Sequence, residues 1–534
     1  MKDNFNLAKA VWQHSQKTPD AVAIVYQGQS LSYAQFADRA RRVAQRLAQS
    51  PDGSNRANKP IKVGVLASRG MDTAVAILGA CWAGAAYVPM GLKLPPDKIL
   101  AIMAACEFSA LIVDNEGDKL LTDEVLAACP TLLIRVGLEA WTEPLVDPLA
   151  LHFQEPAPMN AEDLAYVIFT SGTTGAPKGV MIAAGSVRNY IQTVAQKLNL
   201  QSTDRALETC EITFDVSVHN MFATWQVGAT VFILPANLVM NAVKFAQAEQ
   251  LTVWNSVPSL VGLLQQIKVL SPGVLPALRL SVFGGEALPQ SAARLWQEVA
   301  PNSAIVNLYG PTEATVFCLV KVFAPDAPIT SGRGFVSIGS PLGGCEAMVV
   351  DAEGKELPDD TPGELVIGGV QLAQGYLGAP ELSAKKFPVF NEKRWYLTGD
   401  SAIRDAAGEF HFLGRMDNQI KVSGYRIELE EIDIALRLVS GRDLVGAVAW
   451  PVVDGVAKGI VGFIAGAAMD DAELISGLKR ALQPYMVPQR IIALAHMPLN
   501  ASGKVDRKAL TELLKETVAV SAYTPQRQEV MNGK

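Results

Sequence analysis

Short β-rich runs alternate with helical patterns through the first quarter of the chain, and this alternation constrains the fold more than any other feature. The strand-like runs are rich in valine and isoleucine, and longer helical stretches separate them. Such alternation is typical of α/β layering with largely parallel strands. The predicted strands are 22–25, 61–67, 87–89 and 111–113, and the predicted helices end near residues 48 and 82.

The 534 residues exceed the roughly 250–300 residues at which a single hydrophobic core stops growing, so we expect at least two domains. From residue 363 the pattern changes to short strands and glycine turns, which indicates a β-rich subdomain. A charged turn at 415–417 precedes strand and helix signals that continue to about residue 505. We therefore predict a large layered α/β domain at 1–416, a small C-terminal α+β domain at 417–515 and a tail at 516–534.

Composition excludes several classes of partner. A net charge of -7 argues against nucleic acid and anionic membrane surfaces. The N-terminal sequence leads into no apolar signal segment, and apolar runs such as 74–86 are short and contain glycine, which is typical of buried core. The six cysteines are scattered without a paired spacing, which favours reduced thiols in a cytoplasmic protein over zinc or disulfides.

The strongest local signal is a loop rich in glycine, serine and threonine at 170–179, directly after the predicted strand 165–169. Backbone N–H groups and hydroxyls at this density can surround phosphate oxygens, and Lys178 adds a positive charge. Lys178 is followed by glycine and not by serine or threonine, so the loop is not a Walker A motif. The sequence therefore predicts a phosphate site outside the ordinary P-loop ATPases.

Ten segments, in the family's order, resemble the core motifs of the adenylate-forming superfamily. This superfamily includes the adenylation domains of nonribosomal peptide synthetases, acyl-CoA ligases and luciferases. The resemblance covers nearly the whole chain and implies an ATP-dependent ligase that forms an acyl-adenylate. The segments are 31–36, 83–89, 164–179, 214–217, 307–313, 363–377, 396–400, 414–421, 482–488 and 502–507.

The resemblance implies roles for individual residues. Glu313 matches the ligand of Mg²⁺, an ion that prefers hard carboxylate oxygens. Asp400 matches the acceptor of both ribose hydroxyls, Arg415 a donor to the ribose, and Tyr309 the ring that stacks on adenine. Lys504 resembles a lysine of the C-terminal domain that bridges the substrate carboxylate and the α-phosphate. Such charge neutralisation suits the attack of one anion on another.

The same resemblance completes the ATP site and marks a hinge. Lys504, Lys178 and Glu313 form the implied catalytic set, and Asp417 matches the hinge about which the C-terminal domain turns between two half-reactions. The remaining implied contacts to ATP are Thr170, Ser171, Gly172, Thr173, Thr174, Gly175, Gly284, Gly285, Glu286, Asn307, Gly310 and Thr312.

Asp215 decides the substrate class. In the amino-acid branch of the superfamily the aspartate of this Phe-Asp motif pairs with the α-ammonium of the substrate, and a buried carboxylate needs such a cation. We therefore predict a small α-amino acid whose side chain can be polar, such as alanine, serine, glycine, threonine or cysteine. The predicted lining residues of the side-chain pocket are Val216, His219, Asn255, Ser281, Phe283, Leu308, Val316 and Phe317.

One departure from the family's pattern bears on the acceptor. Glu430 stands where peptide-synthetase domains usually have glycine, and with segments 252–258 and 307–316 it is similar to stand-alone D-alanine–carrier-protein ligases. The expected acceptor is the phosphopantetheine thiol of a separate acyl or peptidyl carrier protein. Residues after Leu510 contain no Gly-Gly-x-Ser phosphopantetheine site, so a free-standing enzyme and a piece of a longer synthetase both stay open.

Two rival functions also stay open. The nearer rival is an acyl-CoA ligase for a small carboxylic acid, which uses the same first half-reaction with CoA as acceptor. The second is a catalytically silent protein that keeps the fold and binds a carrier protein.

Overall fold

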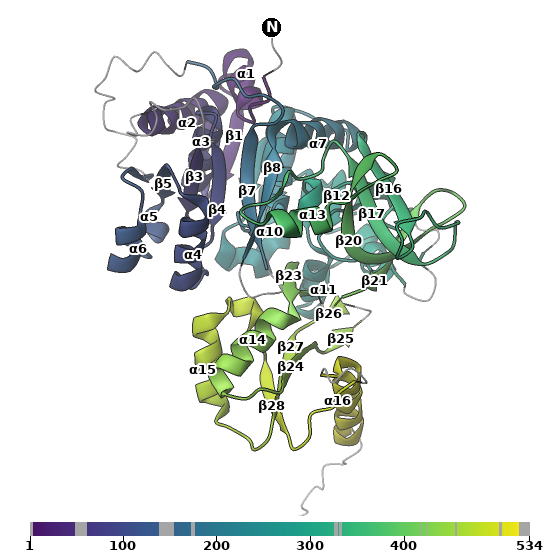
Figure 1. Cartoon of the computed structure of the whole chain (residues 1–534). Coiled ribbons are helices and arrows are strands. Elements are labelled where there is room, and N and C mark those ends of the chain that lie inside the picture. The colour runs from purple at the N-terminus through teal and green to yellow at the C-terminus, as the bar shows by residue number, and fades with distance from the viewer. Residues whose placement is uncertain are drawn as a thin grey trace, which may run out of the picture. The chain divides into compact units, whose positions relative to one another are not determined.

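A computed structural model describes residues 4–48, 61–137, 154–171, 177–324, 329–330, 334–417, 419–422, 424–453, 456–500 and 505–522 (Figure 1). Its internal contacts divide the chain into two compact units. The first contains Met1–Thr170 and Pro177–Asp417, and the second contains Ser171–Ala176 and Asn418–Lys534. The bounds of the three predicted segments stay a prediction.

The first unit contains a nine-stranded sheet among its described residues, with parallel strands in the middle and antiparallel strands at both ends. The central strands are buried on both faces, as is usual for parallel strands, although they include polar residues such as Asn255 and Ser281. In sheet order the strands are β15 (Ser340–Pro341), β14 (Leu319–Val322), β13 (Ala304–Tyr309), β12 (Leu280–Gly284), β11 (Val253–Ser256), β9 (Arg205–Glu208), β10 (Thr230–Ile233), β1 (Val22–Tyr26) and β2 (Gln29–Ser32).

A second, seven-stranded sheet of the same unit is parallel except at the edge formed by β7, β8 and β18. One large apolar cluster contains residues of both sheets and of the helices that cover them. In sheet order the strands are β18 (Gly375–Tyr376), β8 (Lys178–Ala183), β7 (Leu164–Thr170), β4 (Ala86–Met90), β3 (Lys62–Leu66), β5 (Ala110–Val113) and β6 (Leu133–Arg135).

The helices of this unit cover the two sheets. Helix α3 is apolar on all sides because protein surrounds it on all sides. Every α3 residue but Asp72 is buried, as expected of a helix enclosed by protein. A Cβ on Gly79 would lie 2.4 Å from Cβ of Val43 in α2, so glycine permits the close contact of the two helices. The helical segments are α1 (Lys9–Lys17), α2 (Tyr33–Ala48), α3 (Met71–Trp82), α4 (Pro96–Cys106), α5 (Asn115–Asp118), α6 (Asp123–Ala128), α7 (Ala184–Lys197), α8 (Val216–Val218), η4 (His219–Ala223), α9 (Thr224–Gln226), η5 (Ala236–Asn241), α10 (Ala242–Ala248), α11 (Pro258–Gln266), α12 (Gln290–Val299), η6 (Thr312–Ala314) and α13 (Pro380–Lys386).

The predicted β-rich part of the first unit is an antiparallel sheet around the long strand β20, drawn in green in Figure 1. It brings two distant charged residues opposite each other, because β20 and β21 pair in a register that matches Asp400 with Arg415. Its strands are β16 (Cys345–Val350), β17 (Gly363–Gly369), β19 (Val389–Phe390), β20 (Lys393–Arg404) and β21 (Phe410–Arg415).

The second unit is an α+β unit with its own apolar core. Its strands form a four-stranded and a three-stranded sheet within the described residues. Helix α14 ends at Gly441, whose φ of 64° closes the helix in the left-handed conformation that glycine adopts readily. The elements are β22 (Gln419–Val422), β23 (Tyr425–Glu428), α14 (Leu429–Ser440), β24 (Val445–Ala449), β25 (Val452–Val453), β26 (Val456–Ala457), β27 (Ile460–Ala465), α15 (Asp471–Ala481), η7 (Pro484–Met486), β28 (Arg490–Leu494) and α16 (Arg507–Ala522).

The predicted α/β fold class is confirmed. In the part of the chain that the structure covers, no helix is both long and apolar enough to cross a bilayer.

Candidate active site

Asp400 and Arg415 form a buried ion pair at one end of the candidate site. Arg415 Nη1 donates hydrogen bonds to Asp400 Oδ1 and to the carbonyl oxygen of Thr398, both at 2.7 Å. The hydroxyl of Tyr309, the last residue of β13, donates to Asp400 Oδ2. Because each carboxylate oxygen has two lone pairs, both oxygens keep acceptor capacity for a pair of hydroxyls. The geometry therefore suits the predicted contact of Asp400 with ribose.

Gly399 is required for this arrangement. Its φ of 71° lies in the left-handed region. A Cβ there would lie 2.8 Å from Arg415 Nη2 and 3.1 Å from a carboxylate oxygen of Asp417. Arg415 Nε also donates to Asp417 Oδ1 at 2.8 Å, so one guanidinium links Asp400 to the predicted hinge residue.

Tyr309 is neutral in this site because burial raises the pKa of its phenol well above 10, and the neighbouring Asp400 carboxylate raises it further. Its hydroxyl holds Asp400, a role that the sequence did not predict. The predicted stacking of its ring on adenine stays a proposal.

Asn307 and Glu286 have structural partners. Asn307 Nδ2 donates to the carbonyl oxygen of Ser337 at 2.9 Å, and Glu286 Oε2 accepts from the backbone N–H of Ser259 at 3.0 Å. Both side chains are buried. Their contacts to ATP stay a proposal, as do those of Gly284, Gly285, Gly310 and Thr312.

Glu313 presents a buried carboxylate at the short turn η6. Tyr376 donates its hydroxyl to Glu313 Oε1 at 2.8 Å, and the Glu313 carbonyl oxygen accepts the N–H of Ala373. Mg²⁺ is commonly held by one or two carboxylates together with the phosphates of the nucleotide. One buried carboxylate fits that pattern, and the role of Glu313 as the residue that would hold the ion stays a proposal.

The glycine-rich loop joins β7 to β8 at the edge of the seven-stranded sheet. Thr170 and Lys178 are partners in the register of these strands, so they mark the two ends of the loop. Gly172, Thr173, Thr174, Gly175 and the catalytic candidate Lys504 lie outside the described residues. By its contacts Ser171 belongs to the second unit.

Asp215 lies where a continuous helical segment begins, since α8, η4 and α9 follow it without interruption. The side chain is buried. Its charge contributes to the raised pKa of three buried phenols, at Tyr87, Tyr166 and Tyr190. The carboxylate thus lies among aromatic side chains, where water would screen a charge poorly.

His219 is the first residue of the π-helical turn η4 and lies among groups predicted to contact the substrate side chain. Its Nδ1 is 2.6 Å from the Tyr190 hydroxyl, and its ring meets Phe317 edge-on at 5.7 Å between centroids. Burial lowers the pKa of His219 to about 4, although a hydrogen bond with Asn255 opposes the shift. At neutral pH His219 therefore offers a neutral polar group.

The pH dependence of stability should reveal this buried histidine. Because its pKa falls from 6.5 in the unfolded chain to about 4, the unfolded state binds more protons between these values. The stability from neutral His219 is fully present above pH 6.5 and is lost as the pH falls towards 4. The loss is roughly 3 kcal/mol. Chemical unfolding of the native protein and His219→Gln at pH 7 and pH 4.5 checks this, and an equal pH dependence of both would contradict it.

Two predicted pocket residues, Ser281 and Phe283, point away from His219. Ser281 Oγ accepts the indole N–H of Trp296 at 2.8 Å, and the Phe283 ring meets Trp296 edge-on at 5.7 Å. Side chains alternate between the faces of a strand, so Val282 faces the other way and joins the apolar cluster that contains Phe317. The predicted lining was one residue out of register on β12, and Val282 replaces Ser281 and Phe283.

The other predicted lining residues lie on the His219 side. Asn255 is buried, and its Nδ2 donates to the carbonyl oxygen of Leu207 at 3.2 Å. A Cβ on Gly284 would lie 2.5 Å from the Phe317 ring, so glycine lets that ring pack against β12. The same apolar cluster contains Val218, Val282, Leu308, Val316 and Phe317, with the half-buried Val216 packed against it.

A strained turn joins Glu313 to the pocket. Thr315 and Val316 have φ values of 57° and 67°, and a positive φ is rare for a β-branched residue. The buried Gln371 holds this turn, because its Nε2 donates to the carbonyl oxygens of Ala314 at 3.2 Å and Phe317 at 3.0 Å. Apart from its position inside the motif 363–377, no sequence signal marks Gln371 as a residue of the site. Strain of this kind is found at functional sites.

Asp400→Asn should weaken ATP binding without unfolding the protein. The amide keeps the shape of the side chain, but it loses a charged acceptor for ribose, a bond that contributes about 2 kcal/mol. Arg415 keeps Asp417 as a partner. We expect the KM for ATP to rise roughly thirtyfold, measured by pyrophosphate exchange. Asp359→Asn is the matched control, because the exposed Asp359 pairs with Arg404 of β20, the strand that also carries Asp400. The control should leave the KM for ATP unchanged. An unchanged KM for ATP in Asp400→Asn would exclude the ribose role.

Several known proteins are similar to this chain over most of its length. The family described as AMP-binding enzyme matches residues 11–377. The D-alanine–D-alanyl carrier protein ligase of Bacillus licheniformis is 30% identical over 95% of this chain and 99% of its own length. The delta-poly-L-ornithine synthetase of Acinetobacter baumannii is 32% identical over 94% of this chain but only 36% of its own length. Thus the chain spans about a third or less of several large synthetases that it matches.

A solved structure is also similar to this chain along nearly its whole length. The Vibrio cholerae adenylation domain AlmE, determined with glycyl-adenosine-5'-phosphate, superposes with a TM-score of 0.84 at 27% identity, covering 97% of this chain and 99% of AlmE. The chain therefore belongs to the AMP-binding enzymes, the adenylate-forming superfamily that its motifs indicate.

Proposed function

We propose that this protein activates a small α-amino acid with ATP and transfers it to the phosphopantetheine thiol of a separate carrier protein. In the first half-reaction the amino-acid carboxylate attacks the α-phosphorus of ATP, and pyrophosphate leaves. In the second the thiol attacks the carbonyl carbon of the adenylate, the thiol proton is lost, and AMP leaves.

The observation that carries the proposal is the buried carboxylate of Asp215, whose charge acts on the buried phenols of Tyr87, Tyr166 and Tyr190. An α-ammonium group gives this charge a partner in a site where an unpaired ion is costly. A fatty or aryl acid lacks that group and would bring no positive charge to Asp215. Asp215 therefore favours amino-acid activation over the acyl-CoA ligase alternative.

The pocket lining favours a small side chain. Phe317, Leu308 and Val282 occupy volume, and all three are buried in one cluster. His219 and Asn255 are the polar groups among these predicted lining residues, because Ser281 binds Trp296 on the other face of β12. His219 is neutral at pH 7. Glycine, alanine, serine, threonine and cysteine fit this combination. Among the similar proteins, one is named for D-alanine and one was determined with glycyl-adenylate, which supports a small substrate.

Each catalytic residue has a stated task in this proposal. Asp400 and Arg415 hold the ribose, Lys178 neutralises phosphate charge, and Lys504 stabilises the charge that develops on the α-phosphate. Glu313 holds Mg²⁺, which neutralises charge on the phosphates when bound. Asp417, whose carboxylate accepts a hydrogen bond from Arg415, is the hinge residue.

The proposal of carrier loading rests on the similarity of this chain, along nearly its whole length, to a D-alanine–D-alanyl carrier protein ligase. Intact-mass measurement tests it: the protein is incubated with ATP, a small amino acid and a carrier protein with or without its phosphopantetheine arm. We expect one aminoacyl mass increment only on the carrier with the arm. Formation of an acyl-CoA when CoA replaces the carrier, without any carrier loading, would favour the acyl-CoA ligase instead.

A further inference from the structure

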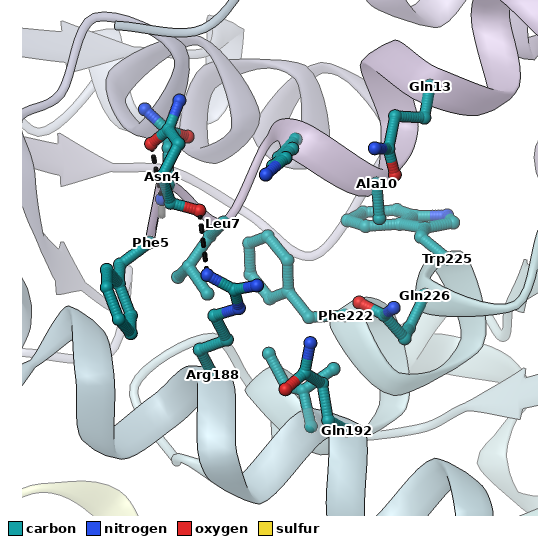
Figure 2. A pocket seen from close by; sticks show the side chains of 13 residues that line it. Asn4, Phe5, Leu7, Ala10, Gln13, Arg188, Gln192, Phe222, Trp225 and Gln226 are labelled. Atoms are coloured by element: carbon teal, nitrogen blue, oxygen red, sulfur yellow. Dashed lines mark hydrogen bonds between the residues drawn. The ribbon is translucent and has the colours of Figure 1, made fainter. Parts of the chain in front are cut away.

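A cavity of about 270 Å³ lies on the first unit, just below the roughly 300–1,000 Å³ range of sites for drug-sized molecules (Figure 2). It lies between the N-terminal segment with α1, helix α7, and the helical segment formed by η4 and α9. None of the proposed catalytic or substrate residues lines it. The lining residues are Asn4, Phe5, Asn6, Leu7, Lys9, Ala10, Gln13, Arg188, Ile191, Gln192, Phe222, Trp225 and Gln226.

The polar lining of this cavity has one sign of charge. Arg188 and Lys9 are cationic, and no carboxylate occurs among the described residues that line it. Figure 2 shows the guanidinium of Arg188 close to Asn4 and Phe222. Its Nη1 donates to the carbonyl oxygen of Asn4 at 3.0 Å, and the Phe5 ring lies 4.8 Å from the guanidinium carbon. These contacts fix the orientation of a group that can bind an anion through two parallel hydrogen bonds.

The rest of the lining suits an apolar body attached to that anion. Phe222 and Trp225 form an aromatic wall, with their rings at 85° and 5.5 Å between centroids. Figure 2 shows the carboxamides of Gln13, Gln192 and Gln226 around the same space. A carboxamide can donate or accept hydrogen bonds, so these groups add no opposing charge. A small aromatic or aliphatic acid has this combination of an anionic head and an apolar body.

The two helical segments that form the cavity also hold the substrate side of the site. Helix α7 carries Arg188 and Gln192 into the cavity lining, and it carries Tyr190 to within 2.6 Å of His219 Nδ1. The π-helical turn η4 begins at His219 and includes Phe222. Turns of this type recur at functional sites and interrupt the regular helical ladder. A ligand that draws α7 and η4 together would therefore act on the Tyr190–His219 contact.

We propose that this cavity binds a small organic anion with an apolar body, and that its occupancy changes the affinity for the amino acid. The anion site itself does not depend on the proposed function, whereas the coupling rests on it. Positively charged and aromatic groups define the ligand class, and α7 with η4 provides the physical connection.

Benzenesulfonate is a suitable probe because it is anionic and aromatic but has no carboxylate to adenylate. We expect saturation-transfer NMR to detect its binding to the full chain, with benzenesulfonamide, its neutral counterpart, binding at least about tenfold more weakly. Arg188→Gln should weaken sulfonate binding by a similar factor. Saturating ATP should not displace the sulfonate.

A second pair of variants keeps the test independent of any folding defect in Arg188→Gln. Gln192→Glu places a carboxylate in the cavity lining and should weaken sulfonate binding. Gln196→Glu makes the same change on the same helix outside the lining and should not. Pyrophosphate exchange then measures the coupling, and we expect benzenesulfonate to shift the amino-acid KM at least about fivefold in the native protein but not in Gln192→Glu.

Equal binding of benzenesulfonate and benzenesulfonamide would overturn the anion site, and so would displacement of benzenesulfonate by ATP. The anion site would also be overturned if neither Arg188→Gln nor Gln192→Glu changed the affinity for benzenesulfonate. Cavity binding without a change in the amino-acid KM would overturn the coupling. If no amino acid supports exchange, the proposed function fails, but the NMR measurement still decides the anion site.

Discussion

Asp215→Asn is expected to raise the amino-acid KM by about a hundredfold or more, with the KM for ATP nearly unchanged. The native carboxylate is buried among aromatic residues and pairs with the substrate ammonium in the proposed complex. Removing one partner of such a buried charge pair costs about 2–5 kcal/mol. Asparagine keeps the size of the side chain, so the loss reports charge and not packing.

The control for this variant is Glu211→Gln, which removes a charge from the same segment. Glu211 pairs with Lys93 at 3.1 Å on the exposed surface, where an ion pair contributes little. The carboxylic acid that lacks the α-amino group gives a second control, because Asp215→Asn should not impair its activation. Equal losses for the amino acid and its des-amino counterpart would exclude Asp215 as the ammonium partner.

Lys504→Ala is expected to reduce adenylate formation by about three orders of magnitude while sparing thioester formation from preformed adenylate. The expectation follows from the resemblance of segment 502–507 to a family motif, since Lys504 lies outside the described residues. A cation aimed at charge that develops in the transition state contributes about 10²–10³ in rate. In the second half-reaction the bond between the carbonyl carbon and the phosphate oxygen breaks, and no bond to phosphorus changes, so no charge develops on the phosphorus centre for Lys504 to stabilise.

Single-turnover measurements of the two half-reactions separate these effects. Lys508→Ala is the matched control, because Lys508 is an exposed lysine at the start of α16. The control should keep both rates. If Lys504→Ala slowed both half-reactions equally, the lysine would have a structural role or a role in binding both substrates.

The sequence predicted the parts of the fold that depend on local pattern. Helix α3 has the predicted bounds of 71–82, and the predicted strands at 22–25 and 111–113 match β1 and β5 within a residue or two. These elements are apolar, short and separated by turns, so their periodicity was not ambiguous. Family membership was readable for another reason, because ten motifs in order carry more information than any single motif.

The contacts that a residue makes across the fold could not be read in the same way. The register of β12 was misjudged because Ser281 and Phe283 alternate with Val282, and one step along a strand changes the face. Serine looked like a pocket residue, yet Trp296 binds it on the far face. Some contacts join segments far apart in the sequence. Tyr309 donates a hydrogen bond to Asp400, and Gln371 donates hydrogen bonds to the carbonyl oxygens of Ala314 and Phe317. No local pattern specifies such pairs.

The most direct test of the central claim is ATP–pyrophosphate exchange with the twenty amino acids, D-alanine, β-alanine and several short carboxylic acids. We predict strong exchange with one small α-amino acid, and much weaker but measurable exchange with its larger homologues and with its des-amino counterpart. Exchange supported only by carboxylic acids without an α-amino group would contradict the role of Asp215 and the amino-acid assignment.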